Sequence, residues 1–143
     1  MDHANGALLL DAQRKSWDKN RMQVFANIMI GLVALQHVFF LVLEMFLWQK
    51  PLGRKTFRLT AEQAKETAVL AANQGLYNGF LAAGLLWALF YPSDFFSRQL
   101  ALFFLGCVLT AAGYGGYSVG KKILFIQGAP ALVGLIATFC WNP

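Results

Sequence analysis

The chain has 143 residues, of which 57% are hydrophobic and 13% charged, and its mean hydropathy is +0.49. A soluble domain carries about 25% charged residues, so this composition excludes an ordinary soluble globular protein and predicts an integral membrane chain. The formal net charge is +5, but the twelve Lys and Arg residues flank the apolar segments. That placement favours anionic lipid headgroups over nucleic acid as the opposite charge.

Residues 1–22 form a polar, basic tail that precedes the first apolar run. The tail carries four cations, a short Leu8–Leu10 patch and Trp17, and two interpretations remain open. It either lies on the membrane surface as an interfacial helix or stays disordered. A cleaved signal peptide is not expected, because the apolar run that follows is too long for one.

Four apolar runs follow the tail, at about residues 24–48, 68–91, 100–119 and 123–141. Each has the length of about 20 residues that a hydrocarbon core of about 30 Å requires. The predicted fold class is therefore all-α, an integral membrane bundle of four transmembrane helices formed by residues 23–143 as one domain.

Local signals refine the ends of these helices. Thr60 followed by Gln63 fits a capping box, which predicts that the second helix begins near Ala61, outside the membrane. Pro92 ends that helix, and the third is expected to begin after Arg98. Pro130, inside the fourth run, predicts a kink or an unpaired carbonyl near Gln127.

Polar side chains concentrate in one half of the predicted bundle, the half next to the basic loop at residues 49–67. Four spans in series alternate direction, so the end of the first, the start of the second, the end of the third and the start of the fourth share this half. The residues placed there are Glu44, Asn73, Gln74, Tyr77, Asn78, Tyr114, Tyr117 and Gln127, with Gln36 and His37 nearer the midplane. Unpaired polar groups are costly in hydrocarbon, so this asymmetry predicts one shared polar pocket.

The roles of these residues stay open between function and structure. Glu44 is either protonated and bonded to an amide, or charged beside a cation, and it either handles a proton or ligand or ties two helices together. For His37 a satisfied packing role is favoured over a proton relay. No metal or cofactor is predicted, because one His and one Glu make a poor ligand set and Cys107 and Cys140 fall within apolar spans. The Gly75, Gly79 and Ala83 ridge predicts close helix contact.

Several segments together resemble a known family. They are Gln36-His37, residues 43–48, Gly53-Arg54-Lys55 with Phe57, the long stretch 70–85, and Gln127-Gly128-Ala129-Pro130-Ala131. The chain resembles the DUF1304 family of small bacterial membrane proteins from about the first helix to its end. The first twenty residues look like an addition to the usual pattern. The resemblance implies a four-helix inner-membrane protein and transfers no catalytic assignment.

Three hypotheses for the function follow. The leading one is a binding or transport protein that holds a small amphipathic or lipophilic molecule in the polar pocket. Assembly as a homo-oligomer and proton coupling through Glu44 are open options of this hypothesis. The second is a membrane enzyme of isomerase or transferase type, with Glu44 and His37 as acid and base. The third is a structural protein whose polar cluster locks helices and whose surface recruits a partner. Seven Lys and Arg on the basic-loop side against five opposite favour a cytoplasmic pocket mouth in the bacterial inner membrane, with both termini outside.

Overall fold

The computed structural model describes the backbone of residues 2–141 and the side chains of residues 8–141. Every element in this part of the chain is helical, which confirms the all-α class. The elements are α1 (Asp2–Met45), α2 (Pro51–Phe57), α3 (Ala61–Glu66), α4 (Ala68–Phe90), α5 (Asp94–Ser118), α6 (Lys121–Ile123), the π-helix η1 (Leu124–Gly128) and α7 (Ala129–Cys140).

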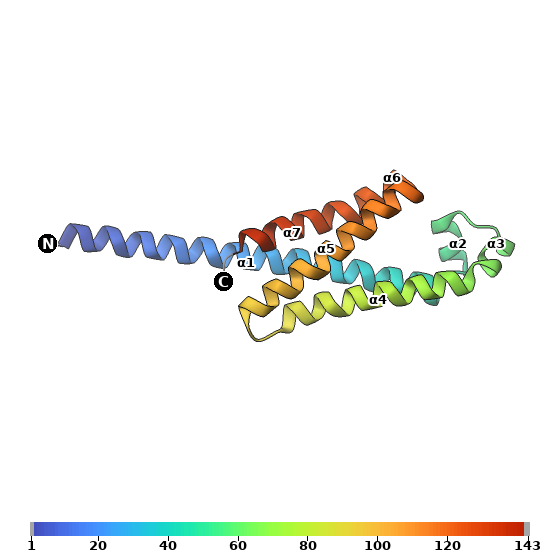
Figure 1. The fold of residues 1–143 in the computed structure, drawn as a ribbon, viewed down its shortest axis with the longest axis horizontal. Coiled ribbons are helices and arrows are strands. Elements are labelled where there is room, and N and C mark those ends of the chain that lie inside the picture. Colours follow the sequence, from blue (N-terminus) through green and yellow to red (C-terminus); the bar gives the residue numbers. More distant parts are fainter. Residues whose placement is uncertain (1, 142–143) are drawn as a thin grey trace.

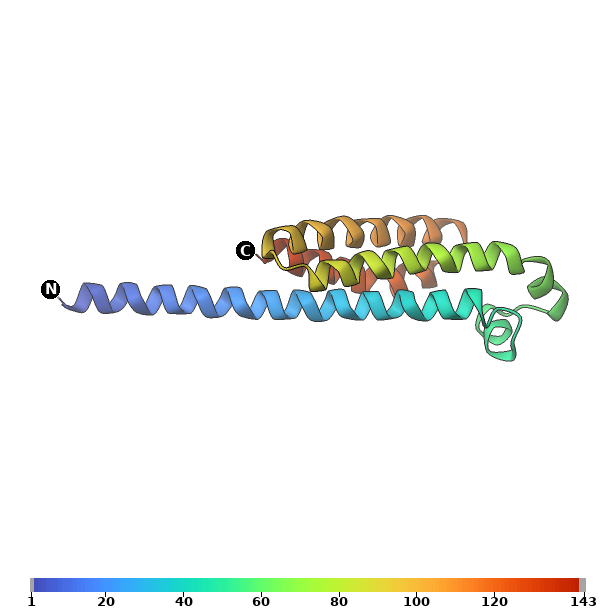
Figure 2. The same cartoon turned by 90° about the horizontal axis from the view of Figure 1, so that it is seen from below.

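Two antiparallel helix pairs build the body of the molecule. Helix α1 packs against α4 and α7, and α5 packs against the same two helices (Figures 1 and 2). Small and branched residues fill the space between them, because they let the backbones approach closely. The main core cluster consists of Ile30, Val33, Ala34, Leu85, Ala88, Ala101, Leu105, Val108 and Ala131.

Three helical segments of the described chain are long and apolar enough to cross a membrane. They are Leu8–Met45, Asp94–Ser118 and Lys121–Cys140. Four such segments were expected. Helix α4 has 23 residues, but its carboxamides Asn73, Gln74 and Asn78 lower its mean hydropathy. Length and composition alone therefore identify a membrane-like helical protein with three candidate spans.

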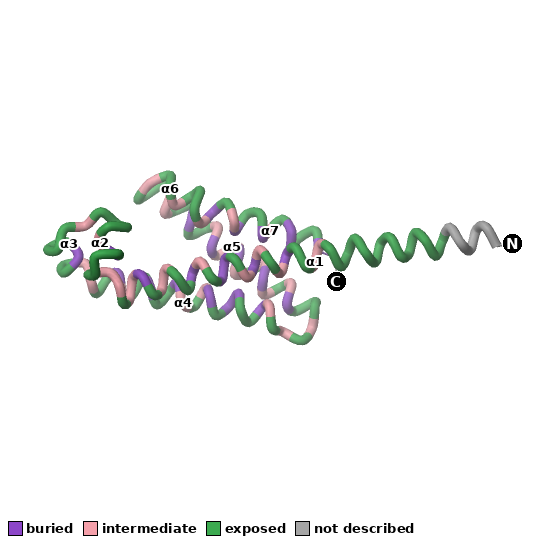
Figure 3. Tube along the Cα trace, turned by 180° about the vertical axis from the view of Figure 1, so that it is seen from behind, coloured by how far each residue is buried: buried purple, intermediate pink, exposed green. Residues whose placement is uncertain are grey.

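The basic tail is not a separate element. Helix α1 runs unbroken through it, and residues 8–21 are exposed along their whole length (Figure 3). No Gly or Pro occurs between Ala7 and Gly31, so nothing in the sequence stops the helix. An ion pair of 2.9 Å between Lys15 and Asp11, one turn apart, adds support on the exposed surface. The part of the tail at residues 1–7 has no described side chains.

The connection between α1 and α4 is folded into two short helices. The capping box is confirmed: Thr60 Oγ1 accepts from Gln63 N–H at 3.2 Å, and Gln63 Oε1 accepts from Thr60 N–H at 2.9 Å. Helix α3 therefore begins at Ala61 as predicted, but it ends at Glu66 and does not run into the membrane helix. Thr67 interrupts the helix there, and its hydroxyl accepts from the Trp48 indole at 3.0 Å.

Helix α5 begins earlier than the sequence suggested, at Asp94 rather than after Arg98. The arginine lies inside the helix because its side chain has partners at the end of α7. Its guanidinium donates to the carbonyls of Trp141 at 2.7 Å, Phe139 at 2.9 Å and Thr138 at 3.1 Å. Carbonyls at the end of a helix lack intrahelical partners, so Arg98 both caps α7 and ties it to α5.

The predicted irregularity before Pro130 is present as a π-helix. Proline has no N–H, so it cannot bond the carbonyl four residues earlier, that of Ile126. The five residues Leu124–Gly128 form η1 directly before α7, and the Ala129 N–H bonds the Leu124 carbonyl. Side chains from α1 meet the chain at this point.

Candidate functional site

Glycines bring α1 and α4 into close contact. A Cβ added at Gly75 would lie 2.7 Å from Met45 Cγ and 3.1 Å from Glu44 Cβ, and one at Gly79 would contact Leu41. The predicted ridge thus packs on α1, although its third member, Ala83, is exposed and Ala82 is buried instead. The close approach brings polar side chains of the two helices within hydrogen-bonding distance.

Glu44 and Asn78 form the polar link between these helices. Asn78 Nδ2 donates to Glu44 Oε2 at 2.7 Å. Asn78 is 5% exposed, whereas Glu44 is half-buried. The other carboxyl oxygen, Oε1, makes no hydrogen bond to the described chain and is not buried. The carboxyl group is therefore held at one oxygen and free at the other.

His37 forms a second polar link, from α1 to η1. Its side chain is fully buried; Nδ1 lies 2.8 Å from the Val33 carbonyl and Nε2 lies 3.0 Å from Gln127 Nε2. A carbonyl can only accept and an amide nitrogen can only donate, so the ring is neutral with its proton on Nδ1. Both ring nitrogens are occupied, and no lone pair or proton is left for another group.

Gln36, beside His37, completes this link. Its Nε2 donates to the Ile126 carbonyl at 2.8 Å, the carbonyl that Pro130 cannot bond. The predicted unpaired carbonyl therefore lies one residue before Gln127, and α1 satisfies it. Gln36 Oε1 is buried without a partner. The side of α1 that faces η1 thus holds the π-helix through two adjacent amide and imidazole side chains.

Five other predicted site residues are not brought into these links. They are Asn73, Gln74, Tyr77, Tyr114 and Tyr117, and all lie on exposed surfaces. The buried stripe of α4 is Ala71, Gly75, Asn78, Ala82 and Leu85, and the buried stripe of α5 is Ser97, Ala101, Leu105, Val108 and Ala112. Only Asn78 among the predicted polar residues of α4 and α5 falls on a buried stripe.

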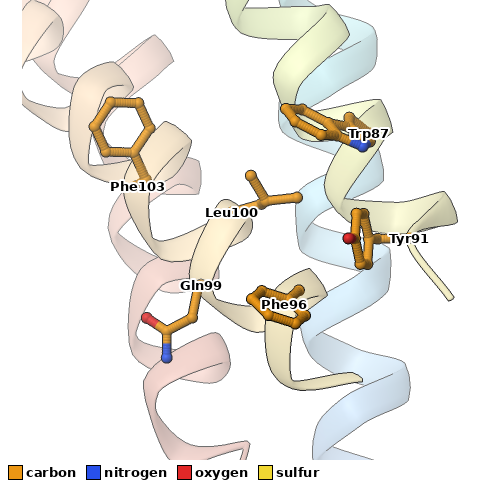
Figure 4. Close-up of a pocket in the computed structure, with 6 residues that line it drawn as sticks. All are labelled: Trp87, Tyr91, Phe96, Gln99, Leu100 and Phe103. Carbon is orange, nitrogen blue, oxygen red and sulfur yellow. The ribbon is translucent and has the colours of Figure 1, made fainter. Parts of the chain in front are cut away.

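Among the surface grooves of the described chain, two lie away from Glu44, Asn78 and His37. The first, of about 250 Å³, lies where α4 turns into α5, with Trp87 of α4 and its C-cap Tyr91 facing Phe96 and Leu100 of α5 (Figure 4). The second, of about 650 Å³, is a shallow depression along α5 between Leu102 and Tyr114. Sequence reasoning missed the first groove, and the four-residue spacing of Trp87 and Tyr91 was its only signal.

Comparison with known proteins places the chain in a family. The model of the family described as "Protein of unknown function (DUF1304)" matches residues 31–139, which is more than half of the chain. The chain belongs to the DUF1304 family. This result confirms the resemblance, and the matched region includes both polar links, from Gln36 to Gln127.

One DUF1304 relative is similar over nearly its whole length. "Uncharacterized protein YpaA" of Lactococcus lactis subsp. lactis (strain IL1403) is 31% identical over 120 residues, which cover 82% of this chain and 99% of the relative. No solved structure matches the chain. The family match begins at residue 31, so the exposed part of α1 precedes the region that the family model describes.

Proposed function

We propose that this chain is a four-span membrane protein that binds or transports a small amphipathic molecule at the α1–α4 interface, at Glu44 and Asn78. Helix α4 acts as the fourth span, since its 23 residues extend about 34 Å and it packs along α1. Of its carboxamides, Asn78, at mid-helix, faces protein, and Asn73 and Gln74 lie within the first two turns of the helix, near the end of the span.

The free oxygen of Glu44 is the observation that carries this proposal. A carboxylate fixed by Asn78 and half-buried between apolar helices presents one strong acceptor to an incoming group. Hydrogen bonds to a charged group contribute about 1.5–3 kcal/mol, more than those between neutral groups. The matching ligand is an alkylamine or similar amphipath, with an N–H donor at Glu44 and an apolar part that contacts the surrounding apolar helices.

The enzyme hypothesis has less support. It needs His37 to exchange a proton with substrate, but both nitrogens of that ring are bonded inside the protein. Any proton exchange at the site falls to Glu44, which is consistent with the proton-linked binding that the sequence suggested.

Binding of octylammonium tests the proposal, measured by calorimetry on the full chain in an uncharged detergent. Replacing Glu44 with Gln should weaken binding about tenfold or more, because the charged acceptor is lost while the shape is kept. Glu66→Gln, at an exposed acid of α3, is the matched control and should leave affinity unchanged. Equal affinity in the Glu44→Gln variant would remove the carboxyl group from the site and favour the structural reading, in which the link only joins helices.

We further propose that the chain lies in the bacterial inner membrane with the α2–α3 connection in the cytoplasm and both termini outside. Seven Lys and Arg flank the spans on the α2–α3 side and five on the other. Alkaline phosphatase fused after Pro143 should be active, because that enzyme works only outside the cytoplasm. Activity of the same reporter inserted after Glu62, with none at the carboxy terminus, would reverse the orientation.

A further inference from the structure

The α2–α3 connection, residues 49–67, is a cationic cap without internal neutralisation. It contains Lys50, Arg54, Lys55, Arg58 and Lys65 against Glu62 and Glu66. The ion pair found among the described side chains joins Lys15 to Asp11, at the far end of α1, so none of the five cations in the cap has an acidic partner. Figure 1 shows α2 and α3 beyond the end of α1, away from the α5–α7 pair.

This cap has a defined conformation. A Cβ at Gly53 would collide with the Leu47 carbonyl and lie 2.7 Å from the Trp48 carbonyl, so α2 lies directly on the end of α1. The Trp48 and Phe57 rings pack with centroids 4.5 Å apart, and the Trp48 indole bonds Thr67. Together these contacts hold α2 against the end of α1 and so define the positions of the backbone that carries the cations.

Three of the cations follow one another at intervals of four residues. Lys50 precedes α2, Arg54 lies one turn later, and Arg58 ends the helix, with its N–H bonded to the Arg54 carbonyl. Lys50 is the extended N-cap of α2 and Arg58 its left-handed C-cap, so the three cations mark the start, middle and end of one short helix. Arg54 Nε is buried and makes no hydrogen bond, so the chain itself does not use this guanidinium. Arg58 adopts φ 55°, a conformation that glycine adopts more readily.

We propose that Lys50, Arg54 and Arg58 bind the phosphate of an anionic phospholipid headgroup. The apolar part of α1 ends at Met45 and α4 begins at Ala68, so α2 lies at the level of the headgroups. Arginine presents several N–H donors that match phosphate oxygens. A lipid is favoured over a free phosphate because the same part of the chain exposes large apolar side chains, Phe46 at 64% and Leu52 at 52%, that can contact acyl chains.

The experiment is native mass spectrometry of the full chain in an uncharged detergent, with equimolar dioleoyl phosphatidylglycerol and dioleoyl phosphatidylcholine as competing probes. The unmodified protein should retain phosphatidylglycerol preferentially. The double variant Lys50→Gln, Arg54→Gln should lose about 25-fold of this preference, at about fivefold per cation. The matched control Lys15→Gln, Lys19→Gln removes the same charge from the exposed part of α1 and should keep the preference.

Equal losses in both double variants would overturn the proposal, because the preference would then reflect total charge. A parallel measurement adds inorganic phosphate at the lipid concentration. Displacement of phosphatidylglycerol by phosphate would show that the site takes free phosphate, and the proposal that its ligand is a phospholipid would be overturned. If the double variant fails to fold, Arg58→Gly replaces it, since glycine suits the backbone at that position. Arg58→Gly should lower the preference about fivefold, and an unchanged preference would overturn the role of Arg58.

Discussion

Helix α1 forms two polar links to its neighbours, and they differ in whether the titratable side chain from α1 keeps an unpaired hydrogen-bonding atom. The link to η1 uses a fully buried imidazole with both nitrogens bonded. The link to α4 uses a half-buried carboxyl group with one oxygen bonded and one free. The two side chains are seven residues apart on one face of α1, so their different surroundings come from the partner helices.

This difference separates a structural contact from a candidate binding site. A buried polar group whose donors and acceptors are all used stabilises packing and offers nothing to a ligand. A polar group that is held in place and keeps one acceptor free is prepared to bind. By this criterion His37 and Gln127 join helices, and Glu44 with Asn78 forms the proposed site. Gln36 Oε1 is unpaired as well, but it is buried and so out of reach of a ligand.

The largest expected effect comes from separating α1 and α4. Replacing Gly75 with Val places methyl groups where Met45 and Glu44 already lie, so the helices must move apart. Overpacking of this kind costs about 1–3 kcal/mol of stability. The midpoint of thermal unfolding in detergent should fall, and octylammonium binding should be lost because Glu44 and Asn78 no longer meet.

Gly106→Val is the matched control for this variant. A Cβ at Gly106 on α5 meets no atom within 4 Å, so the same added volume should change stability little. If the two valine variants unfold at the same temperature, the close contact of α1 with α4 adds no measurable stability. The comparison of the two links would then lose its basis.

A smaller effect is expected from paired substitutions at each link. His37→Leu and Gln127→Leu, combined in a double-mutant cycle, should show a coupling of about 1–2 kcal/mol, since either single change leaves a buried partner unpaired. The same cycle with Glu44→Gln and Asn78→Leu should give less than about 1 kcal/mol, because a half-exposed group can bond water instead. Reversible unfolding in mixed micelles measures both.

A larger coupling at Glu44 and Asn78 than at His37 and Gln127 would reverse the assignment of roles. Gln74→Leu serves as the control for the loss of an amide on α4. Gln74 is exposed, so this change should alter stability by no more than about 0.5 kcal/mol.

Sequence reasoning identified the helical class, the family and part of the candidate site. The capping box at Thr60 and the irregularity before Pro130 were predicted at nearly the right residues, because both depend on local backbone chemistry. Arguments from depth in the membrane also placed Glu44 and Asn78 in the same half of the predicted bundle. These predictions rest on interactions within one helix or on the number of residues between a side chain and the end of its helix.

The other predicted site residues depended on which side of each helix faces its neighbours, and the spacing of residues along the sequence does not determine that side. Gln74 and Asn78 are four residues apart, yet only Asn78 belongs to the stripe of small residues that packs on α1. Tyr114 and Tyr117 flank the buried stripe of α5 in the same way. The single polar pocket that the sequence suggested is therefore replaced by two separate links. Arg98 was treated as a flanking charge, because its partners are carbonyls 40 to 43 residues away, at the end of α7, that no pattern marks.

The π-helix before Pro130 has a consequence for how relatives of this chain are aligned. A turn closed by a bond between residues five apart holds one residue more than an α-helical turn, so η1 is an insertion absorbed inside a helix. Deleting one residue between Lys122 and Pro130 would restore regular α-helical winding and leave both flanking segments facing the same way, because the π-turn absorbs the rotation of about 100° that one extra residue would otherwise cause. A homologue that lacks this residue therefore keeps the same helix faces on either side of η1, and an alignment that places the gap elsewhere compares residues that do not correspond in space.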